Sequence, residues 1–324
     1  MTTVKKNPRF GLVCAISAQV LWGCFPIYVY AVRPPLVNPN DFVAHRSIWS
    51  FFLLVSLVWM SRWIEHPLIP SSKEVAQSLR DRKILGLHAV AALLILFNWL
   101  AFVWAAMNDH VLDSSLGYYI CPLVVVLLGV VLLRERLSGI RWLAVAFAAG
   151  GVGYTTLSQS SWLWISLTIA FSFGFYGLLK KRARLTSLAG LTLETGVLLI
   201  PALAYLLWRA LTAEASMLTS PWWVYVLLIG SGLATIAPLA FYASAVKHLP
   251  LSTVGFLQFI GPTIQFVAGI LFLGESLDIS RLIGFGFVWV GVLLFLISLS
   301  RSTLTDSNRE TTKNVTETIL KSRQ

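Results

Sequence analysis

Charged residues are scarce in this chain of 324 residues: they make up 12% of it, whereas 57% is hydrophobic. Soluble globular proteins carry about 25% charged residues. So few polar side chains do not cover a water-soluble particle of this size, and the composition favours a protein that is surrounded by lipid. The thirteen tryptophans agree with that environment, because indole rings favour the interface between membrane and water.

Acidic residues are fewer than basic ones, 14 against 25, and motifs that would carry enzyme chemistry are missing. The sequence holds no HExxH, DDxxD or GxSxG motif and no Walker A loop, which argues against an intramembrane enzyme and against ATP hydrolysis. The three cysteines all lie in apolar segments without CxxC spacing, so we expect no metal site, no disulfide and no cofactor.

Apolar runs divide the chain into ten candidate membrane spans, since a spanning helix needs about 20 such residues. Their approximate ranges are 10–32, 42–61, 84–107, 112–133, 139–157, 162–180, 188–209, 221–246, 250–273 and 280–299. The predicted fold class is an all-α polytopic membrane protein with ten transmembrane helices. The polar stretch 62–83 is long enough for a short surface helix, and the polar tail 301–324 is expected to be disordered.

The distribution of basic residues predicts the orientation of the chain. If the N-terminus is cytoplasmic, 21 of the 25 lysines and arginines lie in cytoplasmic segments. Positive charge collects on the cytoplasmic side, so both termini are expected there, which requires an even number of spans. The net charge of +11 then reflects loops that face anionic lipid, and a nucleic-acid partner is not expected.

Two stretches 140 positions apart have the same pattern: VVVLLGVVLLRERL at 124–137 and QFVAGILFLGESL at 265–277. Aligning them matches Pro122 with Pro262 and Glu135 with Glu275. The sequence therefore predicts two copies of a five-helix unit, at 1–157 and 158–300. Because five is odd, the second copy enters the membrane from the opposite side. Such inverted repeats are typical of transporters, in which two halves exchange conformations around one central site.

The paired glutamates and prolines have two interpretations each. Glu135 and Glu275 lie between two helices, where a carboxylate either caps the helix that follows or makes a gate contact that breaks when the protein changes state. Pro122 and Pro262 each remove a backbone hydrogen bond, so they either kink their helices or serve as hinges.

The chain resembles the drug/metabolite transporter superfamily, specifically its EamA-like ten-helix transporters and their RarD subfamily. The resemblance covers nearly all of residues 10–300, with Cys121 where the family leads us to expect asparagine. It is carried by HRSIWS (45–50), NWLAFVWAAMNDHVLDSSLGYYICPLVVVLLGVVLLRERL (98–137), LTLET (191–195) and APLAFYASAVKHLPLSTVGFLQFIGPTIQFVAGILFLGESL (237–277).

The resemblance implies a central cavity where the third, fourth, eighth and ninth spans meet the first and sixth. The sequence concentrates polar and aromatic residues in these spans, and such a mixture suits a small amphipathic solute. The amides also serve as helix–helix contacts and the rings as packing, so both roles stay open. The candidates are Asn98, Trp99, Trp104, Tyr118, Tyr119, Tyr242, Gln258, Phe259 and Gln265.

Two charges lie inside predicted spans, where ionisable groups are costly and often functional. Arg46, beside His45 near the outer face, is expected to hold a substrate carboxylate or to close an outer gate. Glu194, near the cytoplasmic face, is expected to pair with Lys180 or Lys181, with proton coupling as the alternative role. His45, Arg46, Lys180 and Glu194 complete the candidates for binding, gating or coupling.

The predicted function is a secondary transporter that moves small organic metabolites or drugs by alternating access across a bacterial inner membrane, with export favoured over uptake. The alternatives are a channel and an intramembrane enzyme, but neither a repeated carbonyl filter motif nor clustered acids are found. The expected partners are the solute and the lipid bilayer, and the carrier is expected to be a monomer or a homodimer.

Overall fold

A computed structural model describes residues 7–32, 36–63, 70–107, 111–159, 163–212, 220–272, 279 and 282–299. Within these ranges the regular structure is entirely helical, which confirms the predicted all-α polytopic fold. The first half holds α1 (Pro8–Ala31), α2 (Pro39–Met60), α3 (Ser72–Ser78), α4 (Arg82–Met107), α5 (Val111–Leu132) and α6 (Gly139–Gln159). The second holds α7 (Leu163–Arg182), α8 (Ser187–Leu211), α9 (Trp222–His248), α10 (Leu251–Leu257), α11 (Ile260–Phe272) and a final helix, Leu282–Leu299.

Local sequence signals explain where the first two helices begin. Asn7 and Asn38 each precede a proline, and each side chain accepts a hydrogen bond from a backbone N–H of the first turn, at 3.1 and 2.9 Å. An asparagine cap satisfies an N–H group that has no partner in the helix, and proline at the first position has no N–H to satisfy. The sequence Asn-Pro therefore fixes both starts.

Nine helical segments of the described chain are long and apolar enough to cross a membrane. They correspond to nine of the ten predicted spans. The tenth prediction, 139–157, falls on α6, a helix of 21 residues that is not among those nine. The predicted short surface helix within 62–83 is confirmed as α3.

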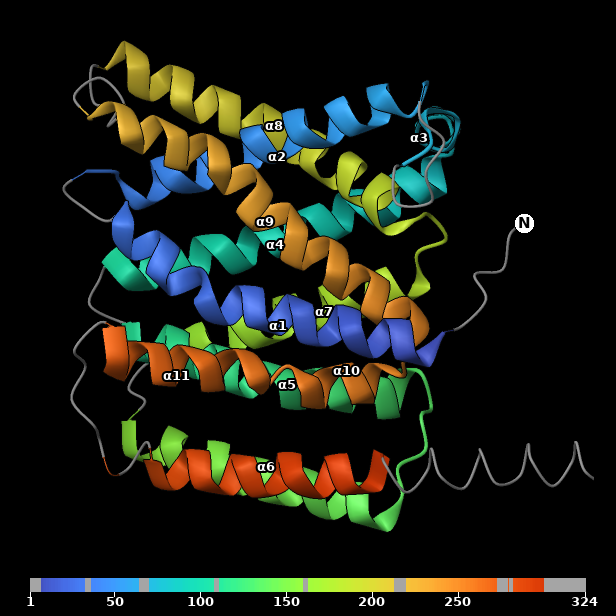
Figure 1. Cartoon of the computed structure of the whole chain (residues 1–324), viewed down its shortest axis with the longest axis vertical. Helices are drawn as coiled ribbons and strands as arrows, with labels where there is room; N and C mark the ends of the chain where they lie inside the picture. The colour runs from blue at the N-terminus through green and yellow to red at the C-terminus, as the bar shows by residue number, and fades with distance from the viewer. Residues whose placement is uncertain are drawn as a thin grey trace, which may run out of the picture.

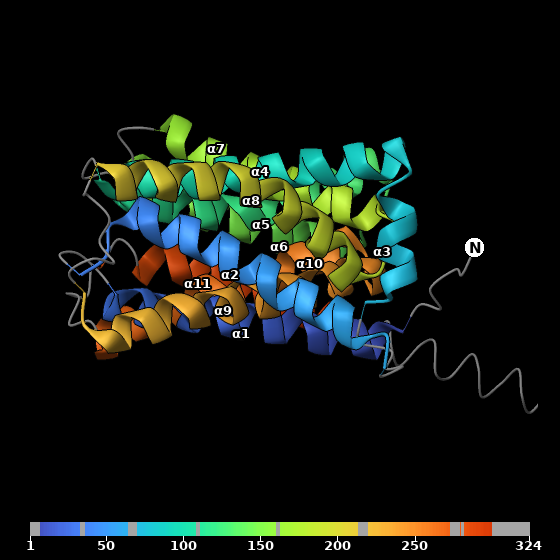
Figure 2. The same cartoon turned by 90° about the horizontal axis from the view of Figure 1, so that it is seen from above.

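The helices lie side by side in a stack, from α2 and α8 at one edge to α6 and the final helix at the other (Figure 1). Helix α3 instead runs across the helix ends, on the side where α1 begins (Figure 2). Its Glu74 carboxylate accepts hydrogen bonds of 2.8 Å from the backbone N–H and the hydroxyl of Thr186, at the start of α8. We call this side of the molecule the inner end and the opposite side the outer end.

The most extensive contacts between helices are paired as an exchange of the two halves requires. Under that exchange α1 corresponds to α7, α2 to α8, α4 to α9, and α5 to α10 with α11. The contact between α1 and α9 then corresponds to the contact between α4 and α7. The contact between α2 and α9 corresponds to that between α4 and α8. The contact between α1 and α11 corresponds to that between α5 and α7. The contacts of α2 with α8 and of α5 with α10 are their own counterparts. The repeat boundaries at 157 and 158 stay a prediction.

The ninth predicted span, 250–273, is two helices rather than one. Helix α10 ends at Leu257 and α11 begins at Ile260, with Gln258 and Phe259 in a turn between them. Pro262 has no N–H to donate to the Gln258 carbonyl, which accepts instead from Gly261 N at 3.2 Å. Helix α5 continues through its equivalent, Pro122, without such a break. The two prolines therefore do not act alike.

Candidate functional site

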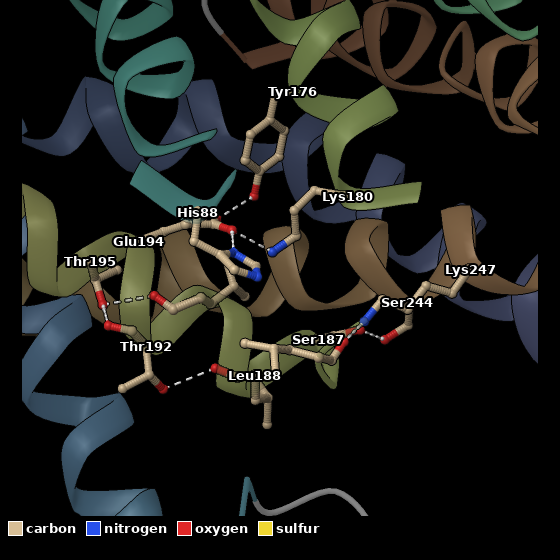
Figure 3. Close-up of polar contacts among 12 residues, drawn as sticks. His88, Tyr176, Lys180, Ser187, Leu188, Thr192, Glu194, Thr195, Ser244 and Lys247 are labelled. Atoms are coloured by element: carbon tan, nitrogen blue, oxygen red, sulfur yellow. Dashed lines mark hydrogen bonds and ion pairs between the residues drawn. The ribbon is translucent and has the colours of Figure 1, made fainter. Parts of the chain in front are cut away.

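A buried ion cluster links three helices near the inner end. Glu194 of α8 accepts hydrogen bonds from Lys180 Nζ at 2.8 Å on Oε1 and from the Tyr176 hydroxyl at 3.1 Å on Oε2, both from α7 (Figure 3). His88 Nδ1 of α4 lies 2.7 Å from Oε1. The side chains of His88, Lys180 and Glu194 are at most 3% exposed. The hydrogen bond between His88 and Glu194 therefore joins the two halves in a low-dielectric interior.

The Glu194 cluster has little room around it. A Cβ atom at Gly190, one turn before Glu194 on α8, would lie 2.6 Å from His88 Cε1 and 3.2 Å from Lys180 Nζ. A carboxylate only accepts hydrogen bonds, so His88 carries a proton on Nδ1, and its buried Nε2 has no hydrogen-bond partner among the described residues. Of the two partners predicted for Glu194, Lys180 makes the pair, while Lys181 donates to the Leu249 carbonyl.

Aromatic rings extend from the Glu194 cluster toward the middle of the bundle. The Phe173 ring lies 5.7 Å from that of Tyr176 and 5.1 Å from that of Tyr242 of α9. Trp22 of α1 lies 5.5 Å from Phe173 and 5.6 Å from Tyr242. The Tyr242 hydroxyl and the buried Gln258 side chain lie close enough to interact but make no hydrogen bond of ordinary geometry.

A second charged site surrounds Arg46 of α2. Its Nε donates to Thr235 Oγ1 of α9 at 3.0 Å. The guanidinium carbon lies 4.2 Å from the centre of the Trp99 ring of α4 and 5.0 Å from that of Phe25 of α1. Both distances suit a cation–π contact. No carboxylate among the described residues lies within ion-pair distance of Arg46.

Arg46 and Glu194 are each the eighth residue of their helices, α2 and α8, which are equivalent under the exchange of halves. Glu194 has a cationic partner, whereas Arg46 has aromatic faces and one hydroxyl. Closer to the outer end, Asp41 accepts from Arg209 Nε at 3.1 Å and from the Tyr205 hydroxyl at 3.0 Å. His45, buried, follows Asp41 by one turn on α2.

Some predicted cavity residues hold helices together. Asn98 is buried and donates to the Ile169 carbonyl at 2.9 Å and to Ser172 Oγ at 3.2 Å, so it ties α4 to α7. Gln265 donates to the Trp22 carbonyl at 3.0 Å and ties α11 to α1. Of the two roles left open for the amides, these contacts favour helix–helix contact.

Three predicted cavity residues lie away from Arg46. Trp104, 39% exposed, has its ring 5.3 Å from that of Trp164, on the outside of the bundle. The Tyr119 ring lies 4.8 Å from that of Phe285, on the final helix. Phe259 is buried in the apolar contact between α10, α6 and the final helix. In contrast, Tyr118 lies near Arg46, and Trp99 is in direct contact with it.

Glu135 caps a helix, but not the one that follows it. Its carboxylate accepts from Leu251 N at 2.6 Å, from Ser252 N at 2.8 Å and from Ser252 Oγ at 2.6 Å, at the start of α10. The expectation of a cap on α6 is therefore wrong, because the loop returns the carboxylate to the opposite half. Glu275, its partner in the repeat, lies outside the described residues.

We expect Glu135→Ala to lower the free energy of unfolding by about 1–2 kcal/mol, because it removes the acceptor for two helix N–H groups. Thermal unfolding in detergent measures the change. Arg136→Ala is the matched control, since Arg136 is adjacent and exposed. Equal losses in the two variants would contradict the capping role.

Several residues that complete these sites are not predicted by any sequence pattern. His88 lies in an apolar run and Tyr176 in an aromatic one, so each taken alone resembles ordinary packing. Asp41 was placed just before the second span, yet it is 1% exposed. One signal was available for His88: it is a titratable residue inside a predicted span, as Glu194 is.

Comparison with known proteins agrees with the membrane fold. The model of the EamA-like transporter family matches the chain twice, at residues 9–157 and 160–297. An uncharacterized transporter of Vibrio cholerae is 38% identical over 298 residues, covering 92% of this chain and 95% of its own. Protein RarD of Escherichia coli K12 is 38% identical over 292 residues, covering 90% and 95%.

A more distant relative and a solved structure complete the comparison. The chloramphenicol-sensitive protein RarD of Pseudomonas aeruginosa is 30% identical over 286 residues, covering 88% of this chain and 92% of its own. A crystal structure superposes with a TM-score of 0.62 at 16% identity, covering 88% of this chain and 96% of its own. At that identity the superposition supports the fold alone.

Proposed function

Because the chain belongs to the EamA-like transporter family, within its RarD subfamily, we propose that it carries small organic solutes across the membrane by alternating access. The coarser conclusion, a multi-pass membrane transporter rather than an enzyme, follows from the family itself. The solute, the direction of transport and the mechanism are the parts that we propose.

The observation that carries this proposal is the pairing of helix contacts under exchange of the two halves. If each half adopts the conformation of the other, the most extensive helix contacts re-form with the inner and outer ends interchanged. A site on the shared surface of the halves then opens to one compartment at a time. The separate match of each half to one family model supports the same duplication.

Polar contacts between the halves at the inner end fit an inner gate. Glu135 binds the start of α10, Glu74 binds the start of α8, and His88 contacts Glu194. At the outer end Asp41 binds Arg209 across the same boundary. We propose that these contacts form and break in alternation, in a bacterial inner membrane with the inner end and both termini in the cytoplasm. Export is the proposed direction.

Counterflow in liposomes tests this function. Purified protein is reconstituted, the vesicles are loaded with an unlabelled solute, and the labelled solute is added outside at low concentration. A carrier accumulates label transiently above its equilibrium level and saturates, whereas a channel does neither. The panel includes chloramphenicol, because one relative bears its name, and vesicles without protein are the control. Absence of counterflow for every solute, with leak-like flux, would favour the channel.

The direction of transport needs a separate measurement in cells. Expression in a strain that lacks its own exporters is expected to lower the intracellular amount of an identified solute. A rise in that amount would favour uptake instead. Reconstituted vesicles without a solute gradient do not report the direction of net transport, because a reversible carrier moves the solute in both directions until its concentrations are equal.

A further inference from the structure

The geometry around Arg46 points to a site for an organic anion: we propose that the transported solute has a carboxylate that pairs with Arg46 and a planar body that lies against Trp99. The inference rests on the proposed transport function and names the class of solute. Nothing in the family match specifies a charge on the solute, so the inference depends on the contacts of this one side chain.

The first argument is charge. An ionised group inside a membrane bundle is costly unless an opposite charge or water stabilises it. Within the described spans, Glu194 is paired with Lys180 and Asp41 with Arg209. Arg46 has no such partner there, although α1, α4 and α9 surround it. The fold therefore holds a cation whose missing counter-charge a solute carboxylate supplies.

The second argument is the set of donors that remains on Arg46. Its Nε is fixed by Thr235 Oγ1, and the Thr235 hydroxyl donates in turn to the Ser231 carbonyl at 2.7 Å. The two terminal nitrogens make no hydrogen bond to described residues, and neither is a fully buried atom. A carboxylate bridges two such nitrogens in parallel, with short charge-assisted bonds. The arrangement orients the guanidinium and leaves its terminal nitrogens without a hydrogen-bond partner among the described residues.

The third argument is the shape of the surroundings. Trp99 and Phe25 contact the guanidinium through their faces, and Tyr118 lies near it on α5. Trp99 is nearly buried, which fixes the plane of its ring. Rings of this kind favour a flat or aromatic body attached to the anion. One guanidinium without a second described cation beside it matches one negative charge, so a carboxylate fits better than a phosphate.

Binding of benzoate, the simplest aromatic carboxylate, is the direct test. The purified full chain in detergent is titrated with benzoate, benzamide, cyclohexanecarboxylate and phenyl phosphate, and binding is measured by calorimetry. We expect benzoate to bind at least tenfold more tightly than benzamide and more tightly than the other two. Equal binding of benzoate and its uncharged analogue would overturn the proposal, and tighter binding of phenyl phosphate would overturn the choice of carboxylate.

Variants localise the binding. Arg46→Gln is expected to weaken benzoate binding at least tenfold. Arg46→Lys is expected to weaken it less, because lysine keeps the positive charge but lacks the two parallel donors. Trp99→Leu should reduce the preference of benzoate over cyclohexanecarboxylate. Arg136→Gln, at an exposed arginine, should change nothing. Unfolding temperature and elution volume confirm that each variant is folded, and unaltered benzoate affinity in folded Arg46→Gln would overturn the site.

An internal acid is the rival partner of Arg46. Asp113 precedes Tyr118 in the sequence by five residues, and its side chain lies outside the described part. If Asp113 neutralised Arg46, Asp113→Asn would create benzoate binding that the unaltered chain lacks, and that result would overturn the proposal. Unchanged affinity in Asp113→Asn supports it.

Counterflow separates this inference from the proposed function. Saturable counterflow of an uncharged solute that survives Arg46→Gln would refute the anion site and leave the carrier intact. Benzoate binding that depends on Arg46, without counterflow of any solute, would refute the carrier and leave the site.

Discussion

Replacing Glu194 with leucine is expected to lower the free energy of unfolding by about 3–5 kcal/mol, because it leaves a buried cation without its anion. Lys180 Nζ lies 2.8 Å from Glu194 Oε1, and its side chain is 1% exposed. Its ammonium has no other hydrogen-bond partner within the described ranges. The Tyr176 hydroxyl and His88 Nδ1 lose their acceptor at the same time.

A double substitution separates the charge from the packing. Glu194→Leu with Lys180→Met removes both charges, and we expect it to be less destabilising than Glu194→Leu alone. Unfolding is followed by circular dichroism in detergent. Ile200→Val is the control, since Ile200 lies on the same helix and is 74% exposed. The single variants are Glu194→Leu and Lys180→Met. If the loss of stability in the double variant equals the sum of the losses in these two, the pair does not interact as the geometry indicates.

The Glu194 cluster also makes a prediction for transport. Glu194→Gln preserves shape but removes the charge that His88 and Lys180 bind, so the contact of α8 with α4 at the inner end should open more readily. We expect a change in the rate of counterflow without a change in benzoate affinity, because Arg46 belongs to the other charged site. Loss of benzoate binding in folded Glu194→Gln would show that the two sites are not separate.

Replacing Gly232 with alanine is expected to lower the free energy of unfolding by about 2–3 kcal/mol, because it inserts a methyl group into a close backbone contact. A Cβ atom there would lie 2.6 Å from the carbonyl carbon of Trp49, 2.8 Å from its oxygen and 2.8 Å from Ser50 N. Ser50 Oγ also donates to the Gly232 carbonyl at 3.3 Å. These are backbone atoms of α2, so α2 and α9 must separate to admit the methyl group.

Two other helical glycines provide the control. A Cβ atom at Gly150 of α6 or Gly86 of α4 meets no atom within 4 Å. Alanine is favoured over glycine inside a helix, so Gly150→Ala and Gly86→Ala should stabilise the protein by about 0.5–1 kcal/mol. All three variants are compared by thermal unfolding in one detergent. A loss in the controls that equals the loss in Gly232→Ala would contradict the packing argument.

Features that depend on local composition could be predicted from the sequence. The apolar runs located the spans because a helix that meets lipid must be apolar over its whole length. The apolar runs placed the starts of the first two spans at 10 and 42, whereas the Asn-Pro pairs at positions 7 and 38 cap α1 and α2 a few residues earlier. Lys180 and Lys181 are the predicted partners of Glu194 because they and Glu194 lie near the adjoining ends of consecutive spans, and Lys180 makes the pair.

Long-range partners were the part that could not be predicted. His88 and Glu194 are 106 positions apart, and Glu135 and Leu251 are 116 apart. Only the packing of α4 on α8 and of α5 on α10 brings them together. The glutamate of the repeat was expected to act on its own neighbouring helix, whereas the fold carries it to the opposite half.

The contrast between Pro122 and Pro262 also lies beyond the sequence. Both prolines remove the same hydrogen bond, yet α5 is continuous and the ninth span is interrupted. A proline weakens one turn, and its surroundings decide whether the turn opens. Gly255, three residues before the interruption, lies so close to α5 that a Cβ atom would be 2.9 Å from the Pro122 carbonyl. The close packing of α10 against Pro122 is a contact that the sequence pattern does not show.

The interruption at Gln258 and Phe259 divides the ninth span into two helices, α10 and α11, in place of one continuous helix. Glu135 binds the start of α10, the shorter helix. The longer helix, α11, packs on α1, where Gln265 donates to the Trp22 carbonyl. A rigid rod would transmit any tilt from one surface of the bilayer to the other. Because the helix is interrupted between them, α10 and α11 can tilt by different amounts, so a movement at the inner end need not be transmitted to the outer end.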